Sequence, residues 1–360
     1  MIKYLGSKRR LVPVLGELCE RAGARTAVDL FTGTTRVAQE FKRRGAKVWG
    51  VDSARYAEVF ARCYVETDSR RVDPAEVDAA LTELDALPGR EGYVTRTFCR
   101  RARYFQPHNG RRIDAIRDAI ASRYAGSPLE PILLTALIEA ADRVDSTTGV
   151  QMAYLKEWAP RSFRPLELRA PTLLPGPGRA VRGDALELAV ELPEVDLAYI
   201  DPPYNQHRYF TNYHVWETLV AWDRPEPYGV ACKRVDARDP STKSAFNDRG
   251  RIAEALGQVV GRIRARVAIV SFSDEGWLAL DDLARICSAR GAVRVLAFDS
   301  RRYVGAQIGI YDPSGRKVGR VSHVRNTEYL LICGERAEVD VLVGGMPARE
   351  PALTSPRPPG

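Results

Sequence analysis

The run Asp201-Pro202-Pro203-Tyr204 contains the residue types that chemistry on an amino group requires. It follows residues 195–200, a short and mostly apolar stretch that predicts a buried strand. Neither proline has a backbone N–H, and the second restrains the first to an extended conformation, so the carbonyl of Pro202 can face a pocket beside the carboxylate of Asp201. Two adjacent acceptors match an amino group with two hydrogens, and Tyr204 offers an aromatic face to a planar base. The plain alternative is a turn that ends a strand and carries an incidental tyrosine.

The amino group that fits such a site is a poor nucleophile, because an exocyclic amine on a purine or pyrimidine shares its lone pair with the ring. When both of its hydrogens are accepted, the lone pair is localised and can attack an electrophile. A base inside a duplex must first be flipped out, which costs about a few kcal/mol. Stacking on Tyr204 would return roughly 1–3 kcal/mol. This chemistry needs no nucleophilic serine or cysteine and no metal ion.

The amino-terminal half has the pattern of a nucleotide-binding βαβ unit. Residues 26–31 predict a strand, Thr32-Gly33-Thr34-Thr35 a tight turn, 36–44 a helix, and 47–51 a second strand that ends at Asp52. An acid about 20 residues after a glycine turn suits the hydroxyl pair of a ribose. Because the turn lacks G-x-G-x-x-G, it disfavours a dinucleotide and favours a cofactor with a ribose and no phosphate, for which S-adenosylmethionine is the obvious candidate. A structural role or another nucleotide is the alternative for this pattern alone.

Further short runs occur in a fixed order along the chain: Lys3–Lys8, Asp29–Gly33, Asp52, Asp184, Asp201–Tyr204, Thr211–His214, Glu217–Leu219 and Asn326–Cys333. In residue type and order they resemble the motifs of a known family, the D12 class of N6-adenine DNA methyltransferases, with the α-type motif order of the Dam-like enzymes. The chain departs from that pattern at Thr34-Thr35, where many members have a second glycine.

The resemblance implies an α/β fold with a Rossmann-like sheet of the S-adenosylmethionine-dependent methyltransferase type. It implies that the cofactor is bound by Lys8, Asp29, Phe31, Gly33, Asp52 and Asp184. It also implies that Asp201, Pro202 and Tyr204 carry out the transfer. Contact with a DNA phosphate is an alternative role for Lys8, and a place in the core is an alternative for Phe31.

The composition is that of a basic globular protein with 360 residues, 45% of them hydrophobic, and a formal net charge of +8. This charge suits a polyanionic partner, although many basic proteins bind none. No apolar run is long enough to cross a bilayer and the start carries no secretory signal, so we expect a cytoplasmic protein. The six cysteines are scattered without a C-x-x-C pair, which predicts free thiols and no metal site.

The expected organisation is a methyltransferase core split by a helical insert. We expect the core over residues 1–67 and 172–345, the insert over 68–171, and a disordered, proline-rich tail over 346–360. Other helices are expected over 9–21, 54–66, 111–124, 129–144 and 278–290, other strands over 267–272 and 293–298, and a hairpin turn at 312–315. The pattern of 111–124 places Ile113, Ile116 and Ile120 on one helix face.

The insert also has a strong local excess of positive charge. Residues 88–125 contain nine arginines and three acids, a net charge of +6, interleaved with the aromatic residues Tyr93, Phe98, Tyr104 and Phe105. Arginines mixed with aromatics can hold phosphates and stack on or wedge between bases. We therefore expect the insert to recognise DNA through Arg100, Arg101, Arg103, Arg111 and Arg112. A solvated helix face is the alternative. A second basic element, the late hairpin over 301–325, has protection of a sheet edge as an equal alternative.

The function that these patterns favour is transfer of a methyl group to N6 of a flipped-out adenine in duplex DNA, at a specific short sequence. Methylation of cytosine N4 or of an RNA base is a second interpretation, because the same acceptor pair serves any exocyclic amine. A third is a DNA-binding relative without catalysis, against which the intact Asp201–Tyr204 run and the acids Asp52 and Asp184 argue. Double-stranded DNA is the expected partner, with no membrane and a monomeric state, and a cognate restriction endonuclease is left open.

Overall fold

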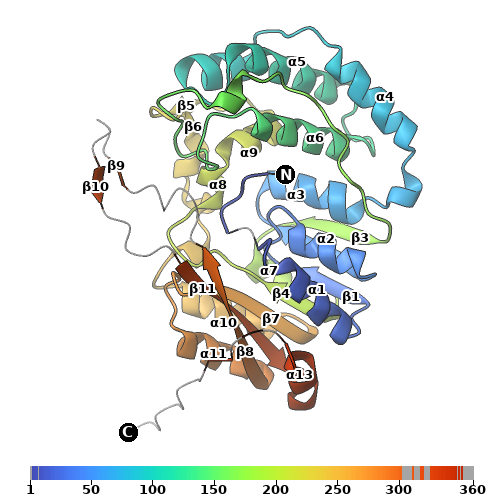
Figure 1. Cartoon of the computed structure of the whole chain (residues 1–360), viewed down its shortest axis with the longest axis vertical. Coiled ribbons are helices and arrows are strands. Elements are labelled where there is room, and N and C mark those ends of the chain that lie inside the picture. The colour runs from blue at the N-terminus through green and yellow to red at the C-terminus, as the bar shows by residue number, and fades with distance from the viewer. Residues whose placement is uncertain are drawn as a thin grey trace.

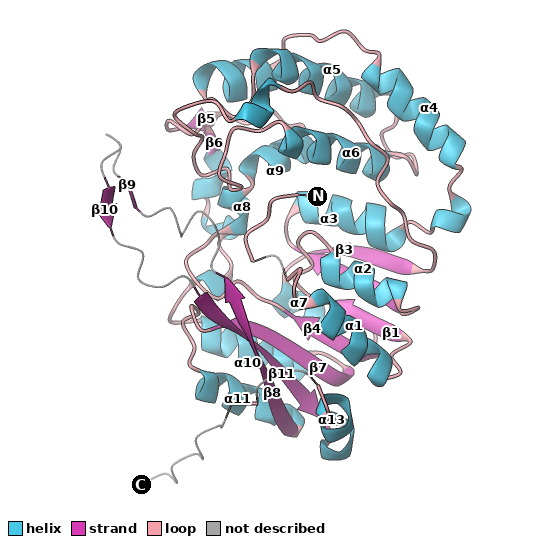
Figure 2. Ribbon diagram, in the orientation of Figure 1, coloured by secondary structure: helices cyan, strands magenta, loops and turns pink. Residues whose placement is uncertain are grey.

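A seven-stranded sheet forms the centre of the molecule in the computed structural model, which describes residues 2–6, 8–301, 310–311, 317–319, 325–346, 348 and 350–351 (Figures 1 and 2). Its strands are β1 (Thr26–Asp29), β2 (Lys47–Asp52), β3 (Gly178–Arg182), β4 (Val195–Ile200), β7 (Ala265–Ser273), β8 (Ala292–Arg301) and β11 (Arg325–Gly334). The spatial order is β3-β2-β1-β4-β7-β11-β8.

Five neighbouring strands, β3 to β7 in that order, pair in parallel, and β11 runs antiparallel to both β7 and β8. Strands β2 and β3 lie on one side of β1, and β4 and β7 lie on the other. The strand order therefore reverses its direction between β1 and β4. Ligands bind at such a point in open α/β sheets, outside the carboxyl ends of the strands. The expected α/β fold class is therefore confirmed.

Helices cover both faces of the sheet, as the apolar faces of a twisted parallel sheet require. One face packs against α1 (Val12–Arg21), α2 (Arg36–Arg43) and α13 (Arg336–Val343), through a buried cluster that includes Leu15, Phe41 and Leu342. The other packs against α7 (Ala185–Glu191), α10 (Ile252–Arg262) and α11 (Leu280–Cys287). All six cysteines are buried and free.

A separate helical layer lies above the strand edge that β3 forms, beyond α3 (Arg55–Ala61) (Figure 1). It contains α4 (Pro74–Asp85), α5 (Pro107–Arg123) and α6 (Glu130–Arg143), and also α8 (Tyr209–Asn212), α9 (His214–Ala221) and the small hairpin of β5 (Pro227–Tyr228) and β6 (Lys233–Arg234). Later segments thus complete a layer begun by residues 74–143. The division of the chain into domains stays a prediction.

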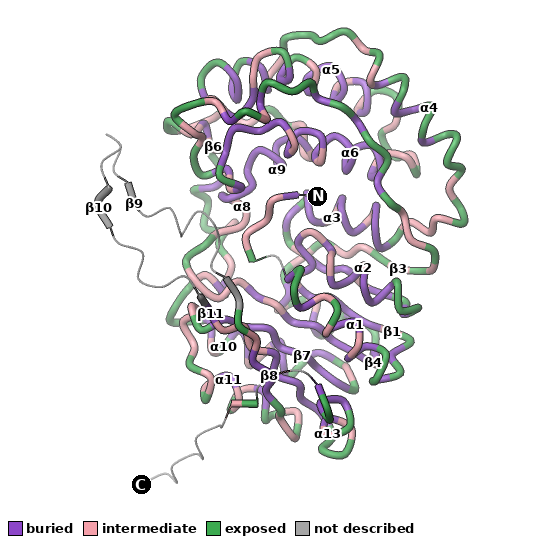
Figure 3. The backbone as a smooth tube through the Cα atoms, viewed as in Figure 1, coloured by how far each residue is buried: buried purple, intermediate pink, exposed green. Residues whose placement is uncertain are grey.

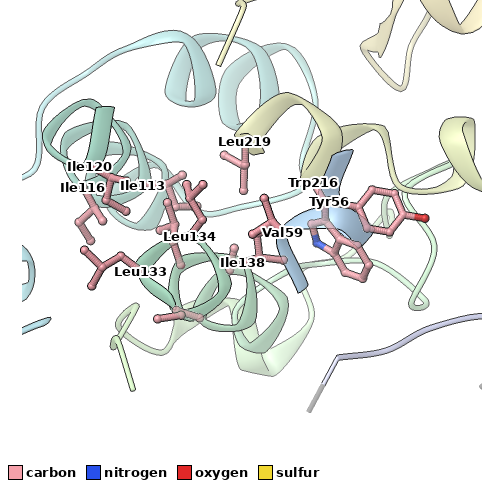
Figure 4. Close-up of a cluster of buried hydrophobic side chains, with 14 of the residues drawn as sticks. Tyr56, Val59, Ile113, Ile116, Ile120, Leu133, Leu134, Ile138, Trp216 and Leu219 are labelled. Atoms are coloured by element: carbon pink, nitrogen blue, oxygen red, sulfur yellow. The ribbon is translucent and has the colours of Figure 1, made fainter. Parts of the chain in front are cut away.

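The core of the helical layer is continuous with the inner side of α3 (Figure 4). Ile113, Ile116 and Ile120 of α5 are fully buried against α6, so the predicted helix face is confirmed. Tyr56 and Trp216 add large apolar surfaces where α3 meets α9, with ring centroids 5.7 Å apart. In Figure 3, buried residues (purple) lie in the interior of both the sheet and the helical layer, and exposed residues (green) lie on the outer sides.

The expected elements differ from the observed ones mainly at their ends. Helix α5 begins four residues earlier than expected, at Pro107, because the fixed φ of proline suits a first helical turn. The helix expected over 54–66 is α-helical only to Ala61 and continues as a π-helical segment, Arg62–Glu66. Strands β9 (Ile310–Tyr311) and β10 (Lys317–Gly319) pair antiparallel, as expected for the late hairpin. Its turn at 312–315, its basic side chains and the tail from 352 lie outside the described residues.

Candidate active site

Four acids from distant parts of the chain meet at one edge of the sheet. Asp29 and Asp52 end β1 and β2, Asp201 directly follows β4, and Asp184 follows β3 at the start of α7. These four strands are parallel neighbours, and adjacent strands lie about 4.7–4.9 Å apart. The sheet therefore places every acid singled out in the sequence along the edge where a ligand is expected.

Asp29 has one carboxylate oxygen without a partner. Its Oδ2 accepts hydrogen bonds from Thr32 Oγ1 at 2.9 Å and from the backbone N–H of Ala38 at 3.1 Å, whereas its Oδ1 is buried and accepts none. Burial raises the pKa of Asp29 to about 7. Buried polar atoms are nearly always paired, so Oδ1 marks a position where a ligand can supply a donor.

Asp52 holds the glycine turn. Its Oδ2 accepts a hydrogen bond from the N–H of Gly33 at 2.9 Å, and its Oδ1 accepts one from Ala54 at 3.0 Å. Burial raises the pKa of Asp52. Gly33 has φ +48°, and a Cβ atom added there would lie 2.9 Å from the Tyr4 hydroxyl. Both conformation and space require glycine at this position.

Thr35, at the departure from the family pattern, adopts the conformation that a glycine would favour. It has φ +60° and ψ 15° and immediately precedes α2. Its buried hydroxyl donates to the carbonyl of Thr34 at 2.7 Å and accepts from Gln39 at 2.9 Å. A left-handed conformation costs a residue with a Cβ roughly 1–2 kcal/mol. The turn thus keeps its shape without the second glycine, at a cost in local strain.

Phe31 and Asp184 have structural contacts as well as their predicted roles. The ring of Phe31 packs edge-on against Phe246, with centroids 5.0 Å apart. Asp184 is exposed and caps α7 by accepting a hydrogen bond from Leu186 N–H at 2.8 Å. Their contacts with a cofactor stay predictions.

The unpartnered oxygen of Asp29 and the glycine turn held by Asp52 together fit a cofactor that has amino and hydroxyl donors and no phosphate. S-adenosylmethionine has these groups.

Asp201 belongs to a buried charge cluster with Lys8 and Glu328. Lys8 Nζ lies 3.2 Å from Asp201 Oδ1 and donates a hydrogen bond to Glu328 Oε2 at 2.9 Å. Burial raises the pKa of Asp201 to about 6, with Lys8 opposing and Glu328 adding to the rise. Burial would lower the pKa of Lys8, but the two carboxylates outweigh it and raise that pKa well above its ordinary value.

Tyr204 is fixed at the floor of a large cavity. Its ring tilts against Phe272 with centroids 5.2 Å apart, and its carbonyl accepts a hydrogen bond from Trp277 N–H at 3.1 Å. The loop that follows is pinned by Asn247, whose side chain donates to the carbonyls of Asn205 at 2.8 Å and His207 at 3.1 Å. Burial raises the pKa of Tyr204, so the ring stays neutral and can stack.

The cavity beside Tyr204 has a volume of about 1070 Å³. Its walls come from the amino-terminal segment, the 148–152 loop, the 204–212 loop, the β5–β6 hairpin and the ends of β8 and β11. Five basic side chains (Lys8, Arg9, Arg10, Arg208 and Lys233) and three acidic ones (Glu275, Asp299 and Glu328) line it. A cavity of this size with a cationic excess can admit a nucleotide.

The arginines predicted to bind DNA belong to residues 95–123 of the helical layer and do not line this cavity. Arg100 is mostly exposed and pairs with Glu91 at 2.5 Å, and Arg103 stacks over Trp158 at 4.8 Å. Arg101 and Arg111 are exposed, whereas Arg112 bonds the carbonyls of Asp85 and Leu87, both at 2.7 Å. Contact of these five arginines with DNA stays a prediction.

The expectation that the interleaved aromatics stack on bases was wrong for three of them. Phe98, Tyr104 and Phe105 are at most 2% exposed and belong to the core of the helical layer. Tyr93 is half-buried, and its hydroxyl donates to the carbonyl of Pro225 at 2.5 Å. Exposure of a large aromatic side chain to water costs free energy that the surrounding arginines do not offset, so these side chains are buried in the core.

Glu328 is the site residue that the sequence did not single out. It lies in the Asn326–Cys333 motif of the family resemblance, directly before the apolar run Tyr329 to Cys333, and the sequence assigns it no role of its own. Because β11 is antiparallel, its amino-terminal part lies at the edge where parallel strands end, with Glu328 opposite Ser273 of β7.

Among the described residues, no group of three or more histidines, cysteines and acids could hold a metal ion, and no helix has the length and apolarity to span a membrane.

Comparisons with known proteins point to one family. The model described as D12 class N6 adenine-specific DNA methyltransferase matches residues 4–258. Modification methylase StsI of Streptococcus sanguinis is 29% identical over 323 residues, which cover 84% of this chain and 49% of that protein. Type II methyltransferase M.NlaIII of Neisseria lactamica is 28% identical over 318 residues, 84% of this chain and 92% of that protein. Type II methyltransferase M.FokI of Planomicrobium okeanokoites is 28% identical over 328 residues, which cover 84% of this chain and 50% of that protein. The chain spans about half the length of StsI and M.FokI and nearly all of M.NlaIII.

Proposed function

The chain belongs to the D12 class of N6 adenine-specific DNA methyltransferases, and from this premise we propose that it methylates N6 of an adenine flipped out of duplex DNA, at a specific short sequence. The observation that carries the proposal is the position of Asp201-Pro202-Pro203-Tyr204. Its Tyr204 lines a cationic cavity of about 1070 Å³, and its Asp201 follows β4, the neighbour of the strand that ends at Asp29. The strand edge suits a methyl donor and the cavity suits a nucleotide.

The reaction at this site follows from its acceptors. S-adenosylmethionine supplies a methyl group on a positively charged sulfur. The carboxylate of Asp201 and the carbonyl of Pro202 accept the two hydrogens of the adenine amino group, which localises its lone pair for in-line attack on the methyl carbon. The N–C bond would form as the S–C bond of the methyl donor breaks, and the methylated nitrogen would then release one proton to the solvent. Tyr204 stacks on the adenine ring and holds the nitrogen in line.

DNA approaches from the cavity mouth, where the basic side chains outnumber the acidic ones. Arg9, Arg10 and Lys233 are placed there to neutralise phosphates close to the flipped base. The arginines of the helical layer extend this basic surface in the proposal and contact phosphates farther along the duplex. The proposed active form is a monomer.

The biological role that we infer is modification in a restriction-modification system. The relatives named above are a modification methylase and type II methyltransferases. On this basis a cognate restriction endonuclease is the proposed partner, and the cytoplasm, where the host DNA lies, is the proposed location.

The experiment that tests the proposal is incubation of the purified protein with unmethylated duplex DNA and S-adenosylmethionine, followed by mass spectrometry of the nucleosides. N6-methyladenine is expected with the wild type and none with Asp201→Asn. N4-methylcytosine, or product only with RNA, would favour the second interpretation. No product from any substrate, with the cofactor still bound, would favour a DNA-binding relative without catalysis. Modification-sensitive sequencing of the product then gives the recognition sequence.

A further inference from the structure

The contacts of Lys8 within its charge cluster are unequal. Its ammonium donates a hydrogen bond to Glu328 Oε2 at 2.9 Å, whereas its approach to Asp201 Oδ1 at 3.2 Å is an ion pair without hydrogen-bond geometry. Asp201 Oδ1 is therefore a buried acceptor without a hydrogen-bond partner. The side chain of Lys8 is only 6% exposed, although it borders the large cavity.

We propose that Glu328 is a positioning residue of the methyl transfer: it holds the ammonium of Lys8 so that Asp201 stays available to the adenine amino group. This proposal rests on the function proposed above. An ammonium has the same hydrogen-bonding character as the target amino group, so Lys8 competes for Asp201 unless a second carboxylate binds it. Glu328 is placed to do so by the antiparallel β11, whose register sets it opposite Phe298 and Ser273.

Glu328 also sets the formal charge of the cluster. Lys8, Asp201 and Glu328 together carry −1, and the nitrogen of adenine becomes positive as it takes the methyl group. With Lys8 and Asp201 alone the cluster would be neutral and would stabilise that positive charge less. Electrostatic complementarity to developing charge is usually the largest contribution of an enzyme site to rate.

Other groups that face Asp201 do not replace this role. The tyrosines Tyr199, Tyr204 and Tyr209 surround it and are neutral, because burial raises the pKa of each. Asp29 is the other acid of the sheet edge that acts on Asp201 through its charge. Among the described residues, Lys8 is the one cation recorded in an ion pair with Asp201.

The test uses the full-length protein with three variants: Glu328→Gln, Lys8→Gln and the double variant. In Glu328→Gln, Lys8 turns to Asp201 and the cluster becomes neutral, so the single-turnover rate on saturating duplex falls about tenfold, within the usual range of coupling between contacting residues. In Lys8→Gln, two adjacent carboxylates raise the pKa of Asp201 and the rate falls. The double variant restores a charge of −1, so it is faster than Lys8→Gln alone. The Glu328→Gln substitution is thus expected to lower the transfer rate of the wild type but to raise the rate of the protein that already carries Lys8→Gln.

This reversal of sign separates positioning from a structural role. If Glu328→Gln slows both backgrounds by the same factor, or neither, the proposal is overturned. Asp340→Asn, which removes a carboxylate of α13 that pairs with Arg294 outside the cavity, is the charge control and should change the rate less than about twofold. The thermal midpoint, measured for each variant, reports folding.

A readout without methyl transfer distinguishes failure here from failure of the proposed function. The titration of Asp201 is followed by NMR on protein with carbon-labelled aspartate, with Asp201→Asn to assign the signal. The pKa of Asp201 is expected to fall in Glu328→Gln and to rise in Lys8→Gln. If these shifts occur but the wild type methylates no DNA, the cluster is as described and the proposed function is wrong. Unchanged titration would overturn the role of Glu328 itself.

Discussion

The Oδ2 atom of Asp52 accepts a hydrogen bond of 2.9 Å from the backbone N–H of Gly33, which ties the end of β2 to the turn that follows β1. The sequence predicts that Asp52 binds a ribose, and in the fold Asp52 also fixes the glycine turn over which Tyr4 packs. The carboxylate of Asp52 thus has a predicted role in binding the ribose and an observed role in holding the glycine turn.

Replacement of Asp52 by alanine should weaken S-adenosylmethionine binding by roughly 1.5–3 kcal/mol, the range for a hydrogen bond to a charged group. The loss combines a missing ribose acceptor with a looser glycine turn. Asp52→Asn keeps an acceptor for the Gly33 N–H, so it should lose less. Calorimetry on the free protein measures both. A dissociation constant unchanged in Asp52→Ala would assign the cofactor to another place.

Asp201→Ala should lower the rate of methyl transfer by on the order of 10²–10³, as for loss of a preorganised polar partner of the reacting atoms. Cofactor binding should be nearly unchanged, because the predicted cofactor residues Asp29 and Asp52 belong to the neighbouring strands. Single-turnover assays and calorimetry give the two values. Full activity in this variant is incompatible with the assigned site.

The transfer rate should fall as the pH drops below about 6. Asp201 accepts the amino hydrogen only as a carboxylate, and burial raises its pKa to about 6, so the active form is present above that pH and is lost below it. Among the charged groups that act on it, Lys8 opposes the rise and Glu328 adds to it. A single-turnover pH profile with saturating DNA and cofactor checks this. An inflection near pH 4 would mean that substrate binding removes the effect of burial.

Asp29→Asn should stabilise the ligand-free protein above pH 7 and weaken cofactor binding. The pKa of Asp29 is raised from 3.8 to about 7 by burial, so the fold favours the protonated form. That contribution to stability is full below pH 4 and is lost as the pH rises through 7. A neutral amide avoids the loss, by on the order of 1–3 kcal/mol at pH 8. The difference in thermal midpoint between the two proteins should be larger at pH 8 than at pH 5.

Replacement of Arg100, Arg101 and Arg103 by alanine should weaken DNA binding and flatten its salt dependence. Each lost phosphate contact reduces the magnitude of the slope of log K against log salt by about 0.9. A matched variant with Arg9, Arg10 and Lys233 replaced tests the cavity mouth by the same measure. A fall in affinity for the cognate site alone, at constant slope, would mean that these arginines read bases. Cofactor affinity should be unchanged in both variants.

Several features could be predicted from the sequence because their causes are local. The strand 195–200 is predicted by its apolar run and is observed with those bounds. The apolar spacing of α5 and the turn around Gly33 likewise depend on residues close in the chain. The order of short motifs was enough to indicate the family, because each motif is read from a few adjacent residues.

Only the tertiary structure decided which distant residues meet and which side chains turn inward. Phe98, Tyr104 and Phe105 alternate with arginines in the sequence, yet they are buried because α5, α6 and α9 together form a core that each helix alone cannot. Lys8 and Glu328 come from opposite ends of the chain and meet Asp201 because β11 runs antiparallel. A sequence pattern carries the preference of a segment for helix or strand, whereas the pairing of strands and the burial of a charge depend on contacts that form only when the whole sheet is assembled.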